Sequence, residues 1–220
     1  MPENSPEIKK KLVQINGGNL VQCGPLIKDR EKALQEVHQV KNAEIVHPYN
    51  DFAVIQGQGT ISLEIFEQIC SENFIDFIIV PVGGGGLLSG TCIATKGISP
   101  KTKVVAAEPF LARDAYISLQ TGNIHPQLPP VTICDGIRTS LGDKTFKIIK
   151  KYCDGIFLVD EQEVVLATNL LWERLKIIVE PSSATVLAAI LKYKNVFEGK
   201  NVVAVISGGN VDIQYKPPGL

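Results

Sequence analysis

The chain has 220 residues and a formal net charge of −1, with 45% hydrophobic and 20% charged residues. These values are ordinary for a folded soluble protein with a substantial core, made of one α/β domain or of one domain with a small appendage. The near-neutral charge argues against broad nucleic-acid binding, and without a long apolar stretch or an apolar signal sequence we expect no membrane span and a cytoplasmic location.

The five cysteines are scattered along the chain, odd in number and without Cys-x-x-Cys spacing. They are Cys23, Cys70, Cys92, Cys134 and Cys153. A disulfide framework or a zinc site would show closer or repeated spacing. We therefore predict reduced thiols that mostly fill the core.

The N-terminal part of the chain is predicted to form an αβαβ unit. A helix begins near Ser5, a candidate cap, and ends at Asn16-Gly17-Gly18, and it is followed by a strand over 19–23, a helix over 30–40 and a strand over 44–47. A parallel-sheet unit normally begins with a strand, and none precedes the first helix here. Either the fold starts differently or the chain lacks a beginning.

Strands and helices alternate along the rest of the chain, which indicates an α/β fold with a mainly parallel sheet. The predicted elements are a cap at 57–60 before a helix over 61–70, a strand over 77–82, a helix from the glycines to Ala94, a strand over 103–107, a helix over 112–121, a loop over 123–130, a helix over 144–152, a strand over 156–159, a helix from an Asp160 cap to about 176, a helix over 182–193 and a strand over 201–206.

Four consecutive glycines follow the central apolar strand and are the most informative feature of the sequence. They are Gly83, Gly84, Gly85 and Gly86. Residues without Cβ let backbone N–H groups approach a ligand closely, and the helix that follows presents its own unpaired amides to the same place. The pattern predicts an anion cradle, typically for phosphate.

Two other interpretations of the glycines are weaker. A tight strand-to-helix connection rarely needs more than one or two glycines. A dinucleotide site is suggested by Glu108 at the end of the next strand, but the Gly-x-Gly-x-x-Gly spacing fails at Leu88 and Ser89. No Gly-Lys-Ser/Thr follows, so there is no P-loop.

Seven motifs occur in an order that resembles a known enzyme family. They are His47-Pro48-Tyr49-Asn50-Asp51, Gly57-Gln58-Gly59-Thr60, Pro81-Val82-Gly83-Gly84-Gly85-Gly86-Leu87, Ala106-Ala107-Glu108-Pro109, Asp135-Gly136, Glu180-Pro181-Ser182 and Ser207-Gly208-Gly209-Asn210. From Met1 almost to Asn210 the chain resembles the pyridoxal-phosphate enzymes of the serine racemase and serine/threonine dehydratase family. The resemblance implies a three-layer αβα fold like that of the tryptophan synthase β-subunit, called fold type II, with 1–50 as the second half of a small domain and 51–220 as an incomplete large domain.

The resemblance also implies a set of cofactor-binding residues. Gly83, Gly84, Gly85, Gly86 and Leu87 would hold the phosphate of pyridoxal 5'-phosphate, and Gly136 would lie beside its ring. Ser207 would hydrogen-bond the pyridine nitrogen. A neutral hydroxyl leaves that nitrogen largely unprotonated, so the ring is a weaker electron sink than when a carboxylate keeps the nitrogen protonated. Taken alone, Ser207-Gly208-Gly209 would be an ordinary turn at a strand end.

A divalent cation is a further expectation. Glu108, the Ala112 carbonyl and Asp114 match the family positions that hold Mg²⁺ or another divalent cation, and carboxylates with a carbonyl suit a hard cation. The alternative is that Glu108 and Asp114 only cap a helix and contact solvent.

One departure from the family bears on activity. Its N-terminal Ser-x-Lys motif, whose lysine attaches the cofactor, and its Ser-Ser-Gly-Asn-His loop are expected to precede Met1, so we expect a chain without the N-terminal third that is inactive alone. Lys96 and Lys176 are the lysines nearest to core segments, and His47 is expected to be structural.

Three hypotheses about function therefore stand. The first is an incomplete lyase or racemase acting on serine, threonine or a related amino acid. The second is a pseudoenzyme that partners a full-length relative. With either hypothesis we expect a homodimer or a heteromer. The third is a dehydrogenase.

Overall fold

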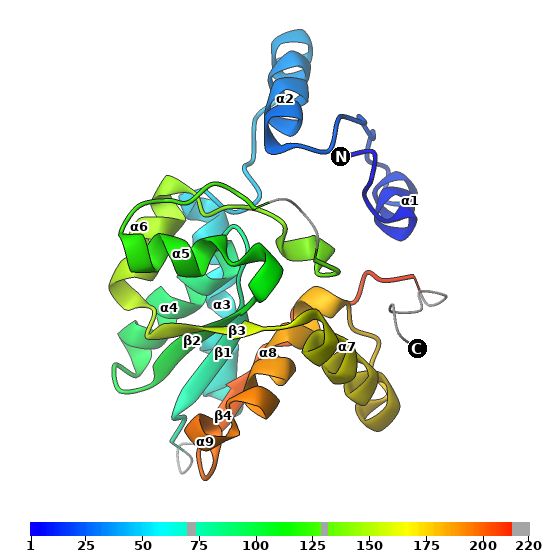
Figure 1. The fold of residues 1–220 in the computed structure, drawn as a ribbon. Coiled ribbons are helices and arrows are strands. Elements are labelled where there is room, and N and C mark those ends of the chain that lie inside the picture. The colour runs from blue at the N-terminus through cyan, green and yellow to red at the C-terminus, as the bar shows by residue number, and fades with distance from the viewer. Residues whose placement is uncertain (70–73, 129–131, 213–220) are drawn as a thin grey trace. The chain divides into compact units, whose positions relative to one another are not determined.

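The computed structural model describes residues 1–69, 74–128 and 132–212, and these form two compact units (Figure 1). One unit comprises Met1–Val46 with the stretch that begins at Gly209, and the other comprises His47–Gly208. Cys70 and the part of the predicted 123–130 loop beyond 128 lie outside the described residues.

The second unit is built on a four-stranded parallel sheet with the strand order β3-β2-β1-β4. The strands are β1 (Phe77–Pro81), β2 (Lys103–Pro109), β3 (Gly155–Val159) and β4 (Val202–Ala204). Because helices cover both faces of a parallel sheet, its inner strands are apolar without interruption, as β1 is. The predicted parallel α/β fold is confirmed.

Helices and short turns connect the strands of this unit. They are α3 (Phe52–Gln68), α4 (Gly86–Ile98), α5 (Asp114–Thr121), α6 (Asp143–Tyr152), α7 (Glu161–Leu170), α8 (Pro181–Lys192) and α9 (Lys194–Phe197), with the 3-10 turns η1 (Phe110–Ala112) and η2 (Asp135–Ile137) and the π-helical turn η3 (Leu171–Leu175). No helix within the described residues is long and apolar enough to cross a membrane.

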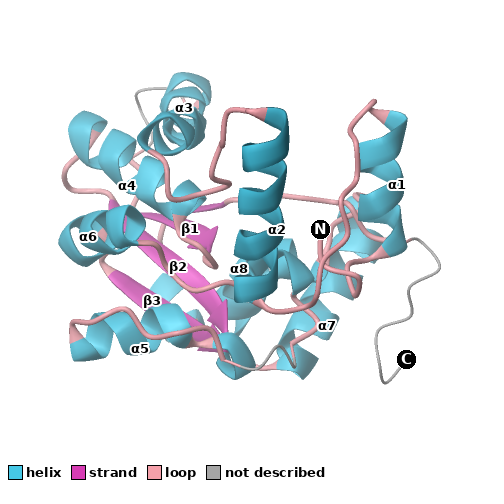
Figure 2. Cartoon of the chain, turned by 90° about the horizontal axis from the view of Figure 1, so that it is seen from above, coloured by secondary structure: helices cyan, strands magenta, loops and turns pink. Residues whose placement is uncertain are grey.

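The two faces of the sheet bury two separate cores. Ile79 and Val105 pack into a cluster with residues of α7 and α8, whereas Ile78 and Val104 pack into a second cluster with residues of α4. Successive side chains of a strand point to opposite faces, which explains the division. Figure 2 shows the strands between α4 and α8, which contact opposite faces of the sheet. The three layers agree with the predicted αβα architecture.

The first unit contains α1 (Glu7–Ile15) and α2 (Ile27–Lys41), as predicted, but its predicted strands over 19–23 and 44–47 are wrong. Within the described residues only a single bridge forms, between Pro2 and Cys23. Val21 and Val46 are 47% and 72% exposed, so no packed layer holds these stretches as strands. The predicted cap at Ser5 is also wrong, because Pro6 occupies the N-cap position of α1.

Helix α3 begins nine residues earlier than predicted and runs through 57–60, which is not a cap. Its N-cap is Asp51, whose carboxylate accepts hydrogen bonds from the backbone N–H groups of Ala53 at 2.8 Å and Val54 at 3.2 Å. Gly59 is inside the helix because it packs on another backbone: a Cβ there would lie 3.1 Å from the Gly90 carbonyl oxygen. By contrast, the predicted Asp160 cap of α7 is confirmed.

Candidate functional site

The four glycines form the connection from the carboxyl end of β1 to the start of α4. All four are buried, and Gly85 is the N-cap of α4 with φ +86°, a left-handed conformation that favours glycine. The backbone N–H groups of Gly83, Gly84, Gly85 and Gly86 donate no hydrogen bond to any residue in the described part of the chain. Buried amides normally have partners, so these groups fit an anionic ligand such as the phosphate of pyridoxal phosphate.

Tyr49 covers the glycine turn, and this contact explains why two of the glycines lack side chains. A Cβ on Gly84 would lie 2.4 Å from atoms of the Tyr49 ring, and a Cβ on Gly86 would lie 2.9 Å from the Tyr49 Cβ. His47 fixes this loop, because its Nδ1 accepts hydrogen bonds from the N–H groups of Tyr49 at 3.3 Å and Asn50 at 2.9 Å. These bonds agree with the structural role predicted for His47.

Helix α6 supports the turn from another side. The buried Thr145 hydroxyl donates to the Gly84 carbonyl at 2.8 Å and accepts from the Gly142 N–H at 3.0 Å. Asn50 links the Tyr49 loop to the same helix, since its amide donates to Asp143 at 2.8 Å and accepts from the Lys144 N–H at 3.0 Å. The position of the glycine turn is therefore set by two segments distant in the sequence.

Ser207 lies at the carboxyl end of the neighbouring strand, β4. The register ends with Ile79 paired to Ala204, and Ser207 follows three residues later, as the glycines follow the end of β1. Its N–H donates to the Ser183 hydroxyl at 2.8 Å, in the first turn of α8, while its side chain is exposed. The structure thus brings Ser207 and the glycine turn to the same edge of the sheet, where ligands of parallel-sheet proteins collect.

Gly136 lies in η2, which contacts both the start of α8 and the glycine turn. Its N–H donates to the Ser182 hydroxyl at 2.9 Å, and a Cβ there would lie 2.8 Å from Oε1 of Glu180. The next residue, Ile137, contacts the turn, since a Cβ on Gly83 would lie 2.7 Å from its Cα. Contacts therefore run from the glycine turn through η2 to the start of α8.

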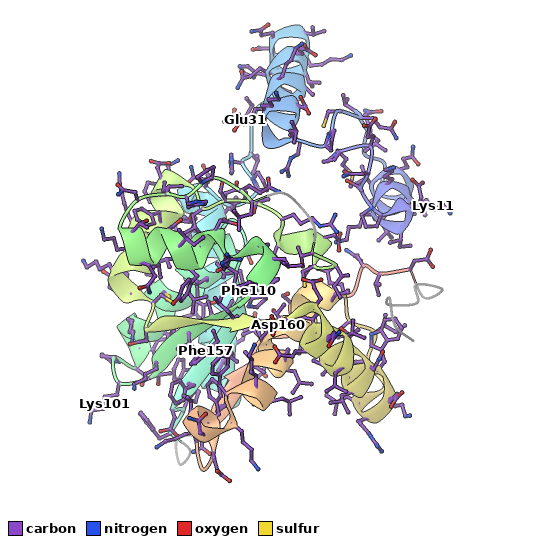
Figure 3. All side chains as sticks on the ribbon, viewed as in Figure 1. Lys11, Glu31, Lys101, Phe110, Phe157 and Asp160 are labelled. Carbon is purple, nitrogen blue, oxygen red and sulfur yellow. The ribbon has the colours of Figure 1, made fainter. Side chains whose placement is uncertain are left out.

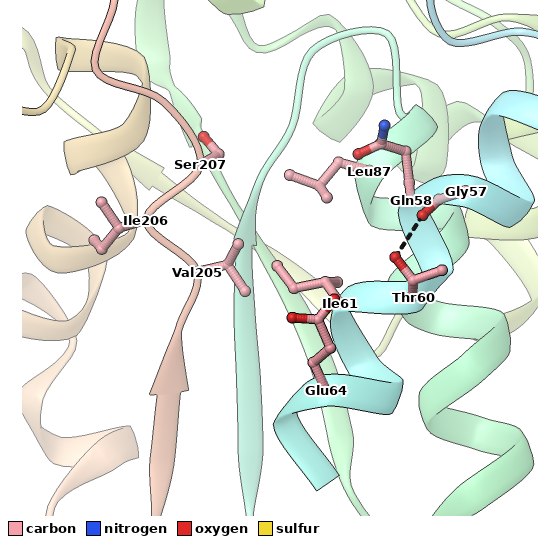
Figure 4. Close-up of a pocket in the computed structure, with 9 residues that line it drawn as sticks. All are labelled: Gly57, Gln58, Thr60, Ile61, Glu64, Leu87, Val205, Ile206 and Ser207. Carbon is pink, nitrogen blue, oxygen red and sulfur yellow. Dashed lines mark hydrogen bonds between the residues drawn. The ribbon is translucent and has the colours of Figure 1, made fainter. Parts of the chain in front are cut away.

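A pocket of about 230 Å³ opens beside the turn (Figure 4). It is lined by Gly57, Gln58, Thr60, Ile61, Glu64, Leu87, Val205, Ile206 and Ser207. Leu87 and Ser207, two of the predicted cofactor residues, therefore face one cavity, whereas the four glycines and Gly136 are not part of this lining. Gln58 and Thr60 were missed because 57–60 was interpreted as a helix cap, and Glu64 was missed because 61–70 was predicted as a helix without a role in the site.

Glu108 and Asp114 lie together and are both about 1% exposed. The Glu108 carboxylate accepts from the N–H groups of Ala115 and Tyr116, each at 2.8 Å, and so caps α5. Burial, and then the charge of Asp114, raise the pKa of Glu108 well above its ordinary value, and burial raises the pKa of Asp114 from 3.8 to about 7.

Asp114 Oδ2 is buried without a hydrogen-bond partner in the described part of the chain. Ala112 is buried in η1 two residues earlier. Within the described ranges no group of three or more His, Cys, Asp or Glu side chains could hold a metal ion. Glu108 thus caps a helix, as the alternative expected, but neither carboxylate meets the solvent that this alternative also implied.

Several lysines that the structure describes have polar partners of their own, and the buried Lys10 pairs with Glu7 at 2.7 Å. One Ser-x-Lys triplet does occur, at Ser99-Pro100-Lys101, but Lys101 is exposed and precedes β2, at the sheet edge opposite the glycine turn (Figure 3). The Lys96 ammonium pairs with Asp154 at 2.8 Å. The Lys144 ammonium donates to the Asn50 carbonyl at 3.2 Å.

Comparison with known proteins gives a consistent result. Residues 1–208 match the family model described as "Pyridoxal-phosphate dependent enzyme". A serine racemase of Dictyostelium discoideum is 48% identical over 217 residues, covering 97% of this chain and 66% of that protein. A beta-hydroxyaspartate dehydratase of Paracoccus denitrificans (strain Pd 1222) is 41% identical, covering 99% of this chain and 68% of that protein.

The solved structures show the same fold. A threonine deaminase from T.th. matches with a TM-score of 0.91 and 39% identity, covering 98% of this chain and 70% of that one. This chain thus spans about two-thirds of the length of these relatives. With its parallel sheet, its buried glycine turn and this likeness over nearly its whole length, the chain belongs to the pyridoxal-phosphate dependent enzymes of fold type II.

Proposed function

We propose that this chain forms the cofactor-binding part of an enzyme that dehydrates β-hydroxy amino acids or racemises serine, with serine, threonine or a related amino acid as substrate. The observation that carries the proposal is the set of four buried glycines, whose N–H groups have no partner within the described residues, at the same edge of the sheet as Ser207. The names of the relatives, which include serine racemase, beta-hydroxyaspartate dehydratase and threonine deaminase, support this substrate class.

Each residue of the site has a definite role in this proposal. The N–H groups of Gly83, Gly84, Gly85, Gly86 and Leu87 bind the phosphate, at the positive end of the α4 dipole. The Ser207 hydroxyl orients the pyridine nitrogen, and Gly136 leaves room for the ring. When bound, pyridoxal phosphate supplies an electron sink for the bonds of the substrate α-carbon.

The chain is proposed to bind the cofactor without turning over substrate by itself. A lysine that attaches the cofactor and moves the α-proton must lie in the site, and Lys101 lies at the opposite edge of the sheet. A non-catalytic partner of a full-length relative is the alternative within the same family. The two are distinguished by mixing this chain with such a relative: recruitment that changes the relative's turnover favours the partner.

The purified chain tests this proposal directly. Pyridoxal phosphate binding is measured by equilibrium dialysis, and the sample is reduced with borohydride and mapped by mass spectrometry. We expect saturable binding, no labelled lysine, and no ketoacid from L-serine or L-threonine in a dehydrogenase-coupled assay. A stably labelled lysine with turnover would overturn the claim of inactivity, and absence of binding would overturn the cofactor site. Preference for a nicotinamide dinucleotide would favour a dehydrogenase.

A divalent cation, Mg²⁺ or another, is proposed to bind Glu108, Asp114 and the Ala112 carbonyl, with water completing the shell. The buried Asp114 Oδ2, which has no hydrogen-bond partner within the described residues, supports this proposal. Calorimetric titration with Mg²⁺, Mn²⁺ and Ca²⁺ tests it. We expect binding that Asp114→Asn abolishes, whereas equal heats for both chains would contradict the site.

We assign residues 1–50 to the small domain and 51–220 to the large domain of the family, in the cytoplasm and with no nucleic-acid partner. Strand β4 is an edge strand among the described residues, and Leu166, Leu175 and Ile178 are more than half exposed. We therefore expect a homodimer or a heteromer, which light scattering during size-exclusion chromatography measures; a monomer at all concentrations would contradict it.

A further inference from the structure

Two cysteines from different helices meet on the α4 side of the sheet. Cys92 lies within α4 and is fully buried, and Cys153 is the half-buried residue that ends α6. Cys153 packs against the core cluster that contains Cys92, and its thiol donates to the Gly155 carbonyl at 3.3 Å. Both are free thiols, and the proposed cofactor site uses neither of them.

The neighbouring residues fix this pair in place. Lys96, one turn after Cys92, forms an ion pair with Asp154, the residue after Cys153, at 2.8 Å. Asp154 also accepts from the Val104 N–H at 2.8 Å, and the Lys96 ammonium also donates to the Thr102 carbonyl at 2.9 Å. One ion pair thus joins α4 directly to the residue after Cys153, and two further hydrogen bonds tie its partners to the start of β2.

The surroundings shift the pKa values of the two thiols in opposite directions. The Cys92 hydrogen bond lowers the pKa of Cys153, with Lys96 acting in the same direction and burial and Asp154 opposing it. Hydrogen bonding to Cys153 and burial raise the pKa of Cys92. Since the thiolate is the nucleophile, the partly accessible Cys153 reacts first with an oxidant, and Cys92 is the resolving thiol.

We propose that Cys92 and Cys153 are an oxidisable pair that a peroxide converts into a disulfide between α4 and the end of α6. The Cys153 thiolate attacks one peroxide oxygen, the O–O bond breaks, and hydroxide leaves while Cys153 becomes a sulfenic acid. The Cys92 sulfur then attacks the Cys153 sulfur and the S–O bond breaks. The Cys92 proton joins the departing hydroxyl to give water.

The bond would tie together two helices that shape the glycine turn. Helix α4 begins at Gly86, and α6 carries Thr145, whose hydroxyl holds the Gly84 carbonyl. A disulfide across this contact closes a long loop in the unfolded chain, so oxidation should raise the urea midpoint of unfolding by about 1 M. A reducing thiol should reverse this shift.

Peptide mapping of the full chain tests the proposal. The reduced chain is treated with a small excess of hydrogen peroxide, alkylated, digested and mapped by mass spectrometry, and its thiols are counted under denaturing conditions. We expect a Cys92–Cys153 cross-link and a fall from five free thiols to three, both reversed by dithiothreitol. A different pair, or Cys153 oxidised to sulfinic acid while Cys92 still alkylates, would overturn the proposal.

Matched serine variants separate this pair from general cysteine oxidation. Cys153→Ser and Cys92→Ser should each abolish the cross-link and the shift in urea midpoint. Cys23→Ser, at a half-buried cysteine in the other unit, should leave both unchanged. Loss of the cross-link in Cys23→Ser, or its survival in Cys153→Ser, would contradict the assignment. The map of the unsubstituted chain stands even if one variant folds poorly.

Discussion

Replacing Thr145 by valine removes one hydroxyl group while keeping nearly the same side-chain shape. That hydroxyl donates to the Gly84 carbonyl at 2.8 Å and accepts from the Gly142 N–H at 3.0 Å. Gly84 is buried, so its carbonyl would lose its partner away from water, whereas the half-buried Gly142 N–H can reach solvent. The substitution therefore tests whether α6 holds the glycine turn in position.

The expected cost follows from these two groups. An unsatisfied buried backbone group costs about 1–3 kcal/mol, and the second, partly exposed group adds less. We expect Thr145→Val to lower the free energy of unfolding by about 2 kcal/mol. Because the displaced group belongs to the turn, the affinity for pyridoxal phosphate should also fall, by about tenfold.

Thr168→Val is the matched control. Thr168 is buried to the same degree, but its hydroxyl donates to the Val164 carbonyl of its own helix at 2.8 Å, and that carbonyl keeps its helical hydrogen bond. This control should cost less than about 1 kcal/mol and leave cofactor affinity unchanged. Urea unfolding followed by circular dichroism and equilibrium dialysis measure the two effects. If Thr145→Val costs no more than Thr168→Val, the proposed support of the turn is wrong.

Three further predictions follow from the site. Ser207→Ala should weaken pyridoxal phosphate binding about 3- to 10-fold by dialysis without moving the urea midpoint, because the side chain is exposed; unchanged affinity would exclude contact with the cofactor. Gly84→Ala should destabilise the chain by about 1–3 kcal/mol in urea unfolding, because the new Cβ would meet Tyr49 at 2.4 Å. Adding Tyr49→Ala should relieve much of that cost. If the free-energy losses of the two single variants simply add in the double variant, the clash is refuted. Without divalent cations, the folded state keeps a proton on Asp114 up to about pH 7, whereas the unfolded state releases it near pH 4. The free energy of unfolding should therefore fall as pH rises through this window. If this pH dependence of the free energy of unfolding is unchanged in Asp114→Asn, relative to a Glu198→Gln control at an exposed carboxylate, the prediction is contradicted.

Much of the second unit could be predicted because its signals are local. The uninterrupted apolar residues of β1, followed by four glycines, indicate a buried strand and a turn that needs close backbone approach. The same reasoning failed at 57–60, which lies inside α3, where Gly59 packs closely on the Gly90 backbone. It also failed at 19–23 and 44–47, where a strand pattern has no neighbouring strand to complete it among the residues that the structure describes.

The supporting residues of the site could not be predicted from local pattern. Thr145 contacts Gly84 across 61 positions of the sequence, and Ser207 meets Ser183 across 24. Tyr49 faces the turn from a loop that the sequence marks only as part of a family motif, with no local signal for this contact. Such contacts depend on how the helices pack against the sheet, which single-sequence periodicity does not specify.

Comparing pyridoxal phosphate with pyridoxal, which lacks the phosphate, tests the central claim most directly. Both ligands are titrated into the full chain by equilibrium dialysis, with inorganic phosphate as competitor. If the glycine N–H groups hold the phosphate, pyridoxal phosphate should bind at least about tenfold more tightly than pyridoxal, and inorganic phosphate should displace it. Equal affinity for the two ligands, with no competition by phosphate, would contradict the account.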